Sequence, residues 1–147
     1  MKKRRPDQSP PVSASEYGRA LKGLGFNLLV RDVGRAVKFA TEVLGAVSYY
    51  DDEDFAAMKL AGGDFMFHAD HTYQGHPLMG VVADIEGRGA GVELRVYGRD
   101  PDVAEQAARH GGWTILAGSM DKPHGLRECA IIDDEGYVWV PGVAIPD

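Results

Sequence analysis

Apolar positions recur along the chain in two patterns, one typical of strands and one typical of helices. Alternating apolar residues occur in GFNLLV at residues 25–30 and again in GVELRV at residues 91–96. Each segment precedes a stretch in which apolar residues lie three and four positions apart, as on one face of a helix. The two strand segments share Gly, Leu and Val at an offset of 66 residues, which indicates an internal repeat.

Both predicted helices have residues that commonly begin and end helices. Asp32 can accept hydrogen bonds from the free backbone N–H groups of the first helix, and Gly45 can adopt the left-handed conformation at its end. The second helix is predicted to begin after Asp100, with Pro101 in its first turn, and to stop at Gly111. Gly45 and Gly111 are again 66 residues apart, so the helices repeat together with the strands.

Three short strands separated by turn residues are predicted after each helix. They cover residues 46–50, 55–60 and 64–69 in the first half, and 113–117, 126–132 and 137–140 in the second. This order predicts an α+β fold in which two tandem βαβββ modules form curved mixed sheets around a cleft. The expected organisation is one domain over residues 21–147, with module 1 at about 21–70, a linker at about 71–90 and module 2 at about 91–142.

Composition and charge narrow the function classes. Residues 1–20 lack hydrophobic periodicity and are expected to be a disordered basic tail. The net charge of the chain is −6, but residues 1–11 carry four basic residues and one acidic residue. The remaining residues therefore have a net charge of −9, which would repel nucleic acid. Apolar runs of about five residues are too short for a membrane span, and no secretory signal is visible, so we expect a cytoplasmic protein without a membrane partner.

Alternation along the strands assigns residues to the two faces of each sheet. The side expected against the helices is uniformly apolar: Leu24, Phe26, Leu28 and Val30 in the first strand, and Val92, Leu94 and Val96 in the second. The opposite faces could curve around a shared cavity on which Asn27, Glu93 and Arg95 converge. The alternative for Glu93 and Arg95 is a solvated strand face or a local ion pair.

Further candidates for that cavity are aromatic and titratable residues on the strands. Phe55 and Trp113 open predicted strands and would form apolar walls, although aromatic side chains also fill protein cores. His68 would point inward as a hydrogen-bond donor. Cys129 lies on a predicted strand, where it should be buried and inert, and a single cysteine excludes an intrachain disulfide.

The segment HADHTYQGH at residues 68–76 concentrates residue types that bind metals. On a strand, His68 and Asp70 share a face while His71 points away, so only a loop could bring these side chains and His76 together. The alternative is a set of polar loop residues without a metal.

The repeat resembles the vicinal oxygen chelate superfamily, which includes glyoxalase I, extradiol dioxygenases, fosfomycin resistance enzymes and bleomycin resistance proteins. The segment LLVRDVGRAVKFATEVLG at residues 28–45 looks like the first strand and helix of this family. GLRECAIIDDEGYVWV at residues 125–140 looks like its closing hairpin. The resemblance covers about residues 21–142 and implies the fold more specifically than the function.

Metal-dependent members of the family bind their ion through His or Glu at four positions. Three of these fall here on Gly25, Gly91 and Val140, which cannot bind a metal, and the fourth falls on Phe67 or His68. The sequence therefore looks like the metal-free branch, whose bleomycin-resistance members hold a drug in clefts at a dimer interface.

The resulting hypothesis is a homodimeric small-molecule binding protein that sequesters its ligand without a cofactor. The resemblance and the strand alternation together suggest these site residues: Asn27, Phe55, His68, Glu93, Arg95, Trp113 and Glu128. The carboxylates of Glu93 and Glu128 would favour a cationic drug. One alternative is a metal-dependent lyase or dioxygenase with a relocated site around His68, His71 and His76, and another is an interaction module whose cleft is filled by its own side chains.

Overall fold

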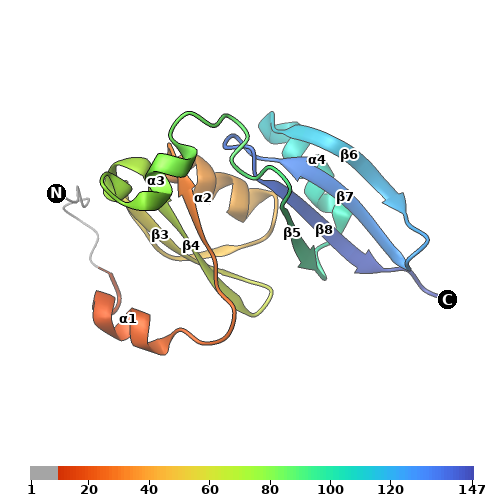
Figure 1. Cartoon of the computed structure of the whole chain (residues 1–147). Helices are drawn as coiled ribbons and strands as arrows, with labels where there is room; N and C mark the ends of the chain where they lie inside the picture. Colours follow the sequence, from red (N-terminus) through yellow and green to blue (C-terminus); the bar gives the residue numbers. More distant parts are fainter. Residues whose placement is uncertain (1–9) are drawn as a thin grey trace.

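The computed structural model describes residues 10–147, which form two similar halves placed side by side (Figure 1). The elements of the first half are α1 (Ala14–Ala20), β1 (Asn27–Val30), α2 (Val33–Glu42), β2 (Val47–Asp51), β3 (Phe55–Leu60) and β4 (Gly63–Ala69). A 3-10 turn, η1 (Asp70–Tyr73), and the short helix α3 (Pro77–Val82) connect the halves. The second half contains β5 (Glu93–Tyr97), α4 (Pro101–Gly111), β6 (Thr114–Asp121), β7 (Leu126–Ile132) and β8 (Val138–Ala144).

The two sheets have the same topology, which confirms the predicted α+β fold of two βαβββ modules. Their strand orders are β1-β4-β3-β2 and β5-β8-β7-β6. In each sheet the first strand pairs in parallel with the last strand of its module, and the other pairings are antiparallel. Asn27 and Glu93, 66 positions apart, occupy the same place at the start of the parallel edge strand.

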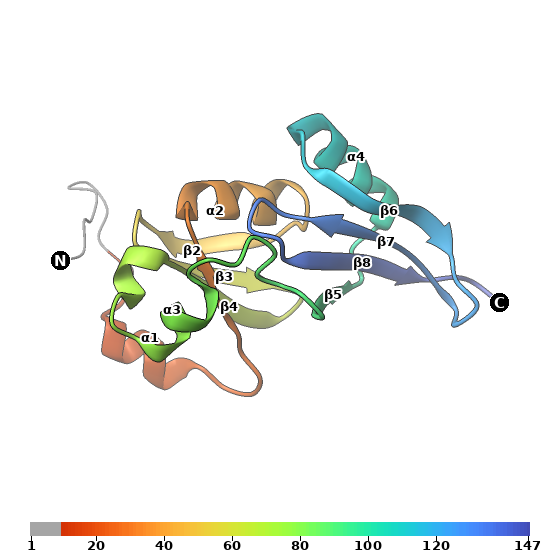
Figure 2. The same cartoon turned by 45° about the horizontal axis from the view of Figure 1, so that its top comes forward.

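The two long helices cover the same side of the sheets, as Figure 2 shows. The Asp32 carboxylate accepts a hydrogen bond from the backbone N–H of Arg35, and Asp100 caps α4 in the same way. Gly45 follows α2 with a φ of 74°, as predicted. At the end of α4, however, the left-handed residue is Gly112 and not Gly111. Gly111 ends the helix itself, and a Cβ there would overlap the ring of Trp113.

The core lies between these helices and the sheets and is continuous across both modules. Phe39 of α2 packs against Trp113, with ring centroids 5.3 Å apart, and against Trp139 of β8 at 6.3 Å. Phe65 of β4 lies 5.7 Å from Trp139. These aromatic contacts hold the two sheets together from the helix side.

Three residues expected on the helix side lie outside the core. Leu24 is 95% exposed, Phe26 is 37% exposed and Val92 is 52% exposed. All three precede the paired strands, which begin at Asn27 and Glu93, so the sheet does not reach them. The strand β6 continues to Asp121, although the sequence predicted a loop after residue 117.

The first 20 residues were predicted to be a disordered tail, and this is wrong for Ala14–Ala20, which form α1. The missed signal is a capping box, in which the Ser13 side chain accepts from the N–H of Glu16 and the Glu16 carboxylate accepts from the N–H of Ser13. The predicted tail at residues 1–9 lies outside the described part. α1 lies beside the first sheet on the side away from α2 (Figure 2). None of the helices in residues 10–147 has the length and apolar character needed to cross a bilayer.

Candidate ligand-binding site

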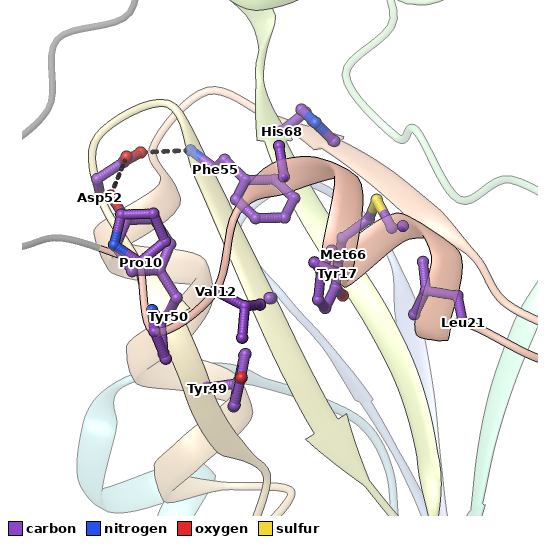
Figure 3. Close-up of a pocket in the computed structure, with 14 residues that line it drawn as sticks. Pro10, Val12, Tyr17, Leu21, Tyr49, Tyr50, Asp52, Phe55, Met66 and His68 are labelled. Carbon is purple, nitrogen blue, oxygen red and sulfur yellow. Dashed lines mark hydrogen bonds between the residues drawn. The ribbon is translucent and has the colours of Figure 1, made fainter.

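A cavity of about 250 Å³ lies between α1, the residues just before it, and the open face of the first sheet (Figure 3). The chain before α1 contributes Pro10 and Val12, and α1 contributes Tyr17. The strands contribute the aromatic residues Tyr49 and Phe55. The helix that the sequence did not predict, together with the residues that flank it, therefore supplies half of the residues that line the cavity.

The strand side of the cavity follows from the pleat of the sheet. Alternate residues of a strand point to the same face, so Phe55 and Ala57 of β3 lie on the open side together with His68 and Met66 of β4. These residues are direct neighbours, because Phe55 pairs with His68 and Ala57 pairs with Met66. Phe55 and His68 therefore lie side by side on the open face of the first sheet, and their contact with a ligand stays a prediction.

Strand β2 contributes two consecutive tyrosines, which a regular strand could not direct to one side. The register of β2 against β3 shifts between Ser48 and Tyr50, so the pleat is interrupted there. As a result both Tyr49 and Tyr50 line the cavity. The Tyr17 ring stacks on Tyr49 with centroids 6.3 Å apart and meets Phe55 edge-on at 6.1 Å.

Asn27 and His68 form a polar group on the same face of the sheet. The Oδ1 of Asn27 lies 2.6 Å from Nδ1 of His68, and its Nδ2 donates to the hydroxyl of Tyr73 at 2.8 Å. Since the Asn27 oxygen can only accept, Nδ1 of His68 carries the proton. The His68 ring also packs against Phe55, with centroids 4.8 Å apart. Asn27 therefore fixes the orientation of a histidine that lines the cavity.

Asp52 places a carboxylate in the cavity wall and was missed by the sequence analysis, which took residues 51–54 only as a turn between two strands. Its side chain accepts from the backbone N–H groups of Asp54 and Phe55 at 2.8 and 2.9 Å, and from the Tyr50 hydroxyl at 2.7 Å. The residue is only 4% exposed. The cavity wall therefore contains a buried carboxylate whose hydrogen bonds all come from neutral donors.

The Tyr17 hydroxyl is buried and has no hydrogen-bond partner in the described part of the chain. Burial raises the pKa of Tyr17, and the negative charge of Asp64 raises it further. The hydroxyl therefore stays protonated. It is an unsatisfied donor at the interface between α1 and the sheet.

The other predicted polar residues, Glu93, Arg95 and Glu128, lie on the second sheet and do not line this cavity. Arg95 forms ion pairs with Glu93 at 3.0 Å and with Glu128, and His124 lies 3.3 Å from Glu128. Although burial acts in the opposite direction, the hydrogen bonds from His124 and Arg95 hold the pKa of Glu128 below its usual value. The sequence analysis left a local ion pair between Glu93 and Arg95 as an alternative to ligand contact, and the structure contains this ion pair.

Trp113 was predicted to be a wall of the cavity, and the structure corrects this. It is 5% exposed and lies in the core against Phe39, with the guanidinium of Arg35 5.0 Å from its ring. The sequence placed Trp113 at the start of a strand, but β6 begins one residue later, at Thr114.

The histidines of HADHTYQGH have separate partners. The Nε2 of His71 lies 2.5 Å from the fully buried carboxylate of Asp54, and His76 accepts from the N–H of Leu78 to cap α3. Within residues 10–147, no three His, Cys, Asp or Glu side chains are close enough to share a metal ion. Of the family's ligand positions, Val140 is buried in the core.

Comparisons with known proteins agree on the fold. No family model and no curated protein matches the sequence. Among solved structures, a glyoxalase-related enzyme from Fulvimarina pelagi is similar with a TM-score of 0.66 and 16% identity, over 84% of this chain and 88% of that chain. A glyoxalase/bleomycin resistance/dioxygenase protein from Nocardioides is similar with a TM-score of 0.62 and 18% identity, over 89% of this chain and 91% of that chain. The fosfomycin resistance protein FosX from Listeria monocytogenes is similar with a TM-score of 0.63 and 12% identity, over 85% of this chain and 95% of that chain. The chain therefore has the fold of the glyoxalase/bleomycin resistance/dioxygenase proteins, as its resemblance to the vicinal oxygen chelate superfamily implied.

Proposed function

We propose that this protein binds and sequesters a small molecule without a metal, in the manner of bleomycin resistance proteins. The observation that supports this most strongly is the aromatic cavity between α1 and the first sheet, with the polar group of Asn27 and His68 on the same face. Binding sites for small molecules are typically concave and mostly apolar, with a few fixed polar groups. This cavity has both properties.

The size of the cavity indicates which part of a ligand it would hold. Sites for drug-sized ligands measure roughly 300–1,000 Å³, so 250 Å³ suits a small aromatic compound or one ring system of a larger molecule. The flat walls of Tyr17, Tyr49 and Phe55 favour a flat ligand, because stacked rings bury large areas in defined geometries.

We also propose that the protein acts as a homodimer. The second sheet leaves large apolar side chains in water, with Tyr97 61%, Leu116 60% and Met120 50% exposed. Exposed apolar groups of this size favour contact with another surface. Sedimentation of the full chain should give a species of about twice 15.9 kDa at micromolar concentration, and a single species of 15.9 kDa would contradict the dimer.

The binding function can be tested by titration calorimetry with three probes of similar shape. They are p-tert-butylphenol, which is neutral, p-hydroxyphenyltrimethylammonium, which is a cation, and p-hydroxybenzenesulfonate, which is an anion. Measurements in EDTA should show binding of at least one probe. Phe55→Ala should weaken that binding about tenfold, because it removes a wall of the cavity.

The matched control is Val103→Ala, which truncates an exposed apolar side chain on α4, outside the cavity and outside the residues proposed for the dimer, and should leave the affinity unchanged. If no probe binds, or if both substitutions weaken binding equally, the proposed site is wrong. Binding that disappears in EDTA and returns with Zn²⁺, Ni²⁺, Mn²⁺ or Fe²⁺ would instead favour the metal-dependent lyase or dioxygenase.

A further inference from the structure

We infer that the cavity selects an organic cation, and that Asp52 is the residue that sets this preference. The inference rests on the proposed function, because it names the class of ligand for the same cavity. It depends on three observations: the carboxylate of Asp52, the aromatic rings that line the cavity, and the pairing of the second-sheet glutamates with Arg95.

Within residues 10–147, the carboxylate of Asp52 has no cationic partner. Its partners are two backbone N–H groups and the hydroxyl of Tyr50, all of which are neutral. None of the lining residues, which all belong to the described part of the chain, is a lysine or an arginine. A carboxylate that is 4% exposed acts through a medium of lower dielectric constant than water, so its field in the cavity is strong.

The rings that wall the cavity favour a cation as well. The faces of aromatic rings carry partial negative charge and attract ammonium groups. Tyr49 already shows this behaviour, because the ammonium of Lys59 lies 5.4 Å from its ring centre. Lys59 is paired with Asp64 at 2.9 Å, so its charge is offset locally and does not cancel that of Asp52.

The second sheet shows the contrast. There the carboxylates of Glu93 and Glu128 are both bound by Arg95, with His124 close to Glu128. A ligand cation would have to displace Arg95 to use them. The cationic preference that the sequence assigned to these glutamates is therefore expected from Asp52 on the first sheet instead.

The test compares the three probes on the full chain at about pH 7, where their phenol groups are still largely protonated. The cation should bind about tenfold more tightly than p-tert-butylphenol, and the anion should bind most weakly. Asp52→Asn keeps the shape of the side chain and an oxygen that accepts from the backbone. It should weaken binding of the cation about tenfold and leave the neutral probe within about twofold.

The matched control is Asp51→Asn, which makes the same charge change one residue away on a side chain that does not line the cavity. It should leave the preference for the cation intact. Equal affinity for the cation and the neutral probe, or equal effects of the two substitutions, would overturn the inference while the cavity remains a binding site. Failure of all three probes to bind would instead contradict the proposed function itself.

Discussion

Arg88 donates two hydrogen bonds to the carboxylate of Asp70, at 2.6 and 2.7 Å, and so fastens the connection between the modules to the end of β4. The same guanidinium donates to the backbone carbonyl of Leu29 in β1 and lies 3.8 Å from Glu135 in the turn before β8. Only 1% of the Arg88 side chain is exposed. One cation therefore joins the linker, the first module and the second module.

Replacing Arg88 with methionine should destabilise the protein by about 3 kcal/mol, because two carboxylates would lose a buried cationic partner. Chemical denaturation measures this change in the free energy of unfolding. The control is Arg109→Met on α4, where the arginine is exposed and pairs with Glu105 four residues away. That variant should differ from the parent by less than about 0.5 kcal/mol, and an equally small effect at Arg88 would refute its bridging role.

The elements that could be predicted from sequence have local signals. Asp32, Gly45 and Asp100 mark helix ends through hydrogen bonds and backbone conformations within a few residues, and the structure confirms them. The face of the first sheet on which Asn27 and His68 lie could be predicted from the alternation of apolar and polar residues, because both residues are on regular paired strands.

The parts of the site that were missed depend on irregular or long-range features. The register shift near Tyr49 brings two adjacent tyrosines to one face, and no alternation rule contains it. Trp113 follows Gly112 outside the regular strand and enters the core. Arg95 has one glutamate partner two residues away, but its pairing with Glu128 requires the β5–β8–β7 arrangement. Only the capping box of α1 was a readable signal that the sequence analysis overlooked.

Tyr17→Phe should leave stability unchanged or raise it by up to about 1 kcal/mol. The substitution removes a buried hydroxyl that has no partner and keeps the ring contacts with Tyr49 and Phe55. Tyr17→Ala should lower stability by about 1 kcal/mol, because those contacts are lost. Thermal unfolding followed by calorimetry measures both variants. A Tyr17→Phe protein less stable than the parent would mean that the hydroxyl is satisfied.

Stability should fall at acid pH in part through Glu105. The backbone N–H of Ser119 donates to its carboxylate at 2.5 Å, and Arg109 forms an ion pair with it, so the pKa of Glu105 lies below its usual value in the folded protein. A lowered pKa contributes stability above the ordinary value of 4.5, and this contribution is lost as the pH falls through the folded pKa. The stability difference between the parent and Glu105→Gln should therefore shrink as the pH is lowered, and a difference independent of pH would contradict this.

Cys129 should be unreactive in the folded protein. It is 2% exposed, its Sγ lies 3.5 Å from the carbonyl oxygen of Pro101, and burial raises its pKa to about 11. The thiolate is the form that attacks a thiol reagent, and it is scarce at neutral pH when the pKa is this high. Ellman's reagent should give no colour with native protein and one equivalent after denaturation. Rapid reaction of the native protein would show that the strand β7 opens.

The most direct test of the account locates a bound probe on the protein. Two-dimensional amide spectra of isotope-labelled protein, titrated with p-hydroxyphenyltrimethylammonium in EDTA, report which backbone groups change environment. Small-molecule binding in the cavity predicts shifts at Tyr17, Ala57 and Met66, which line it, and none at Glu93 and Glu128 on the second sheet. Shifts confined to the second sheet, or no shifts at all, would contradict the claim that this cavity is the binding site.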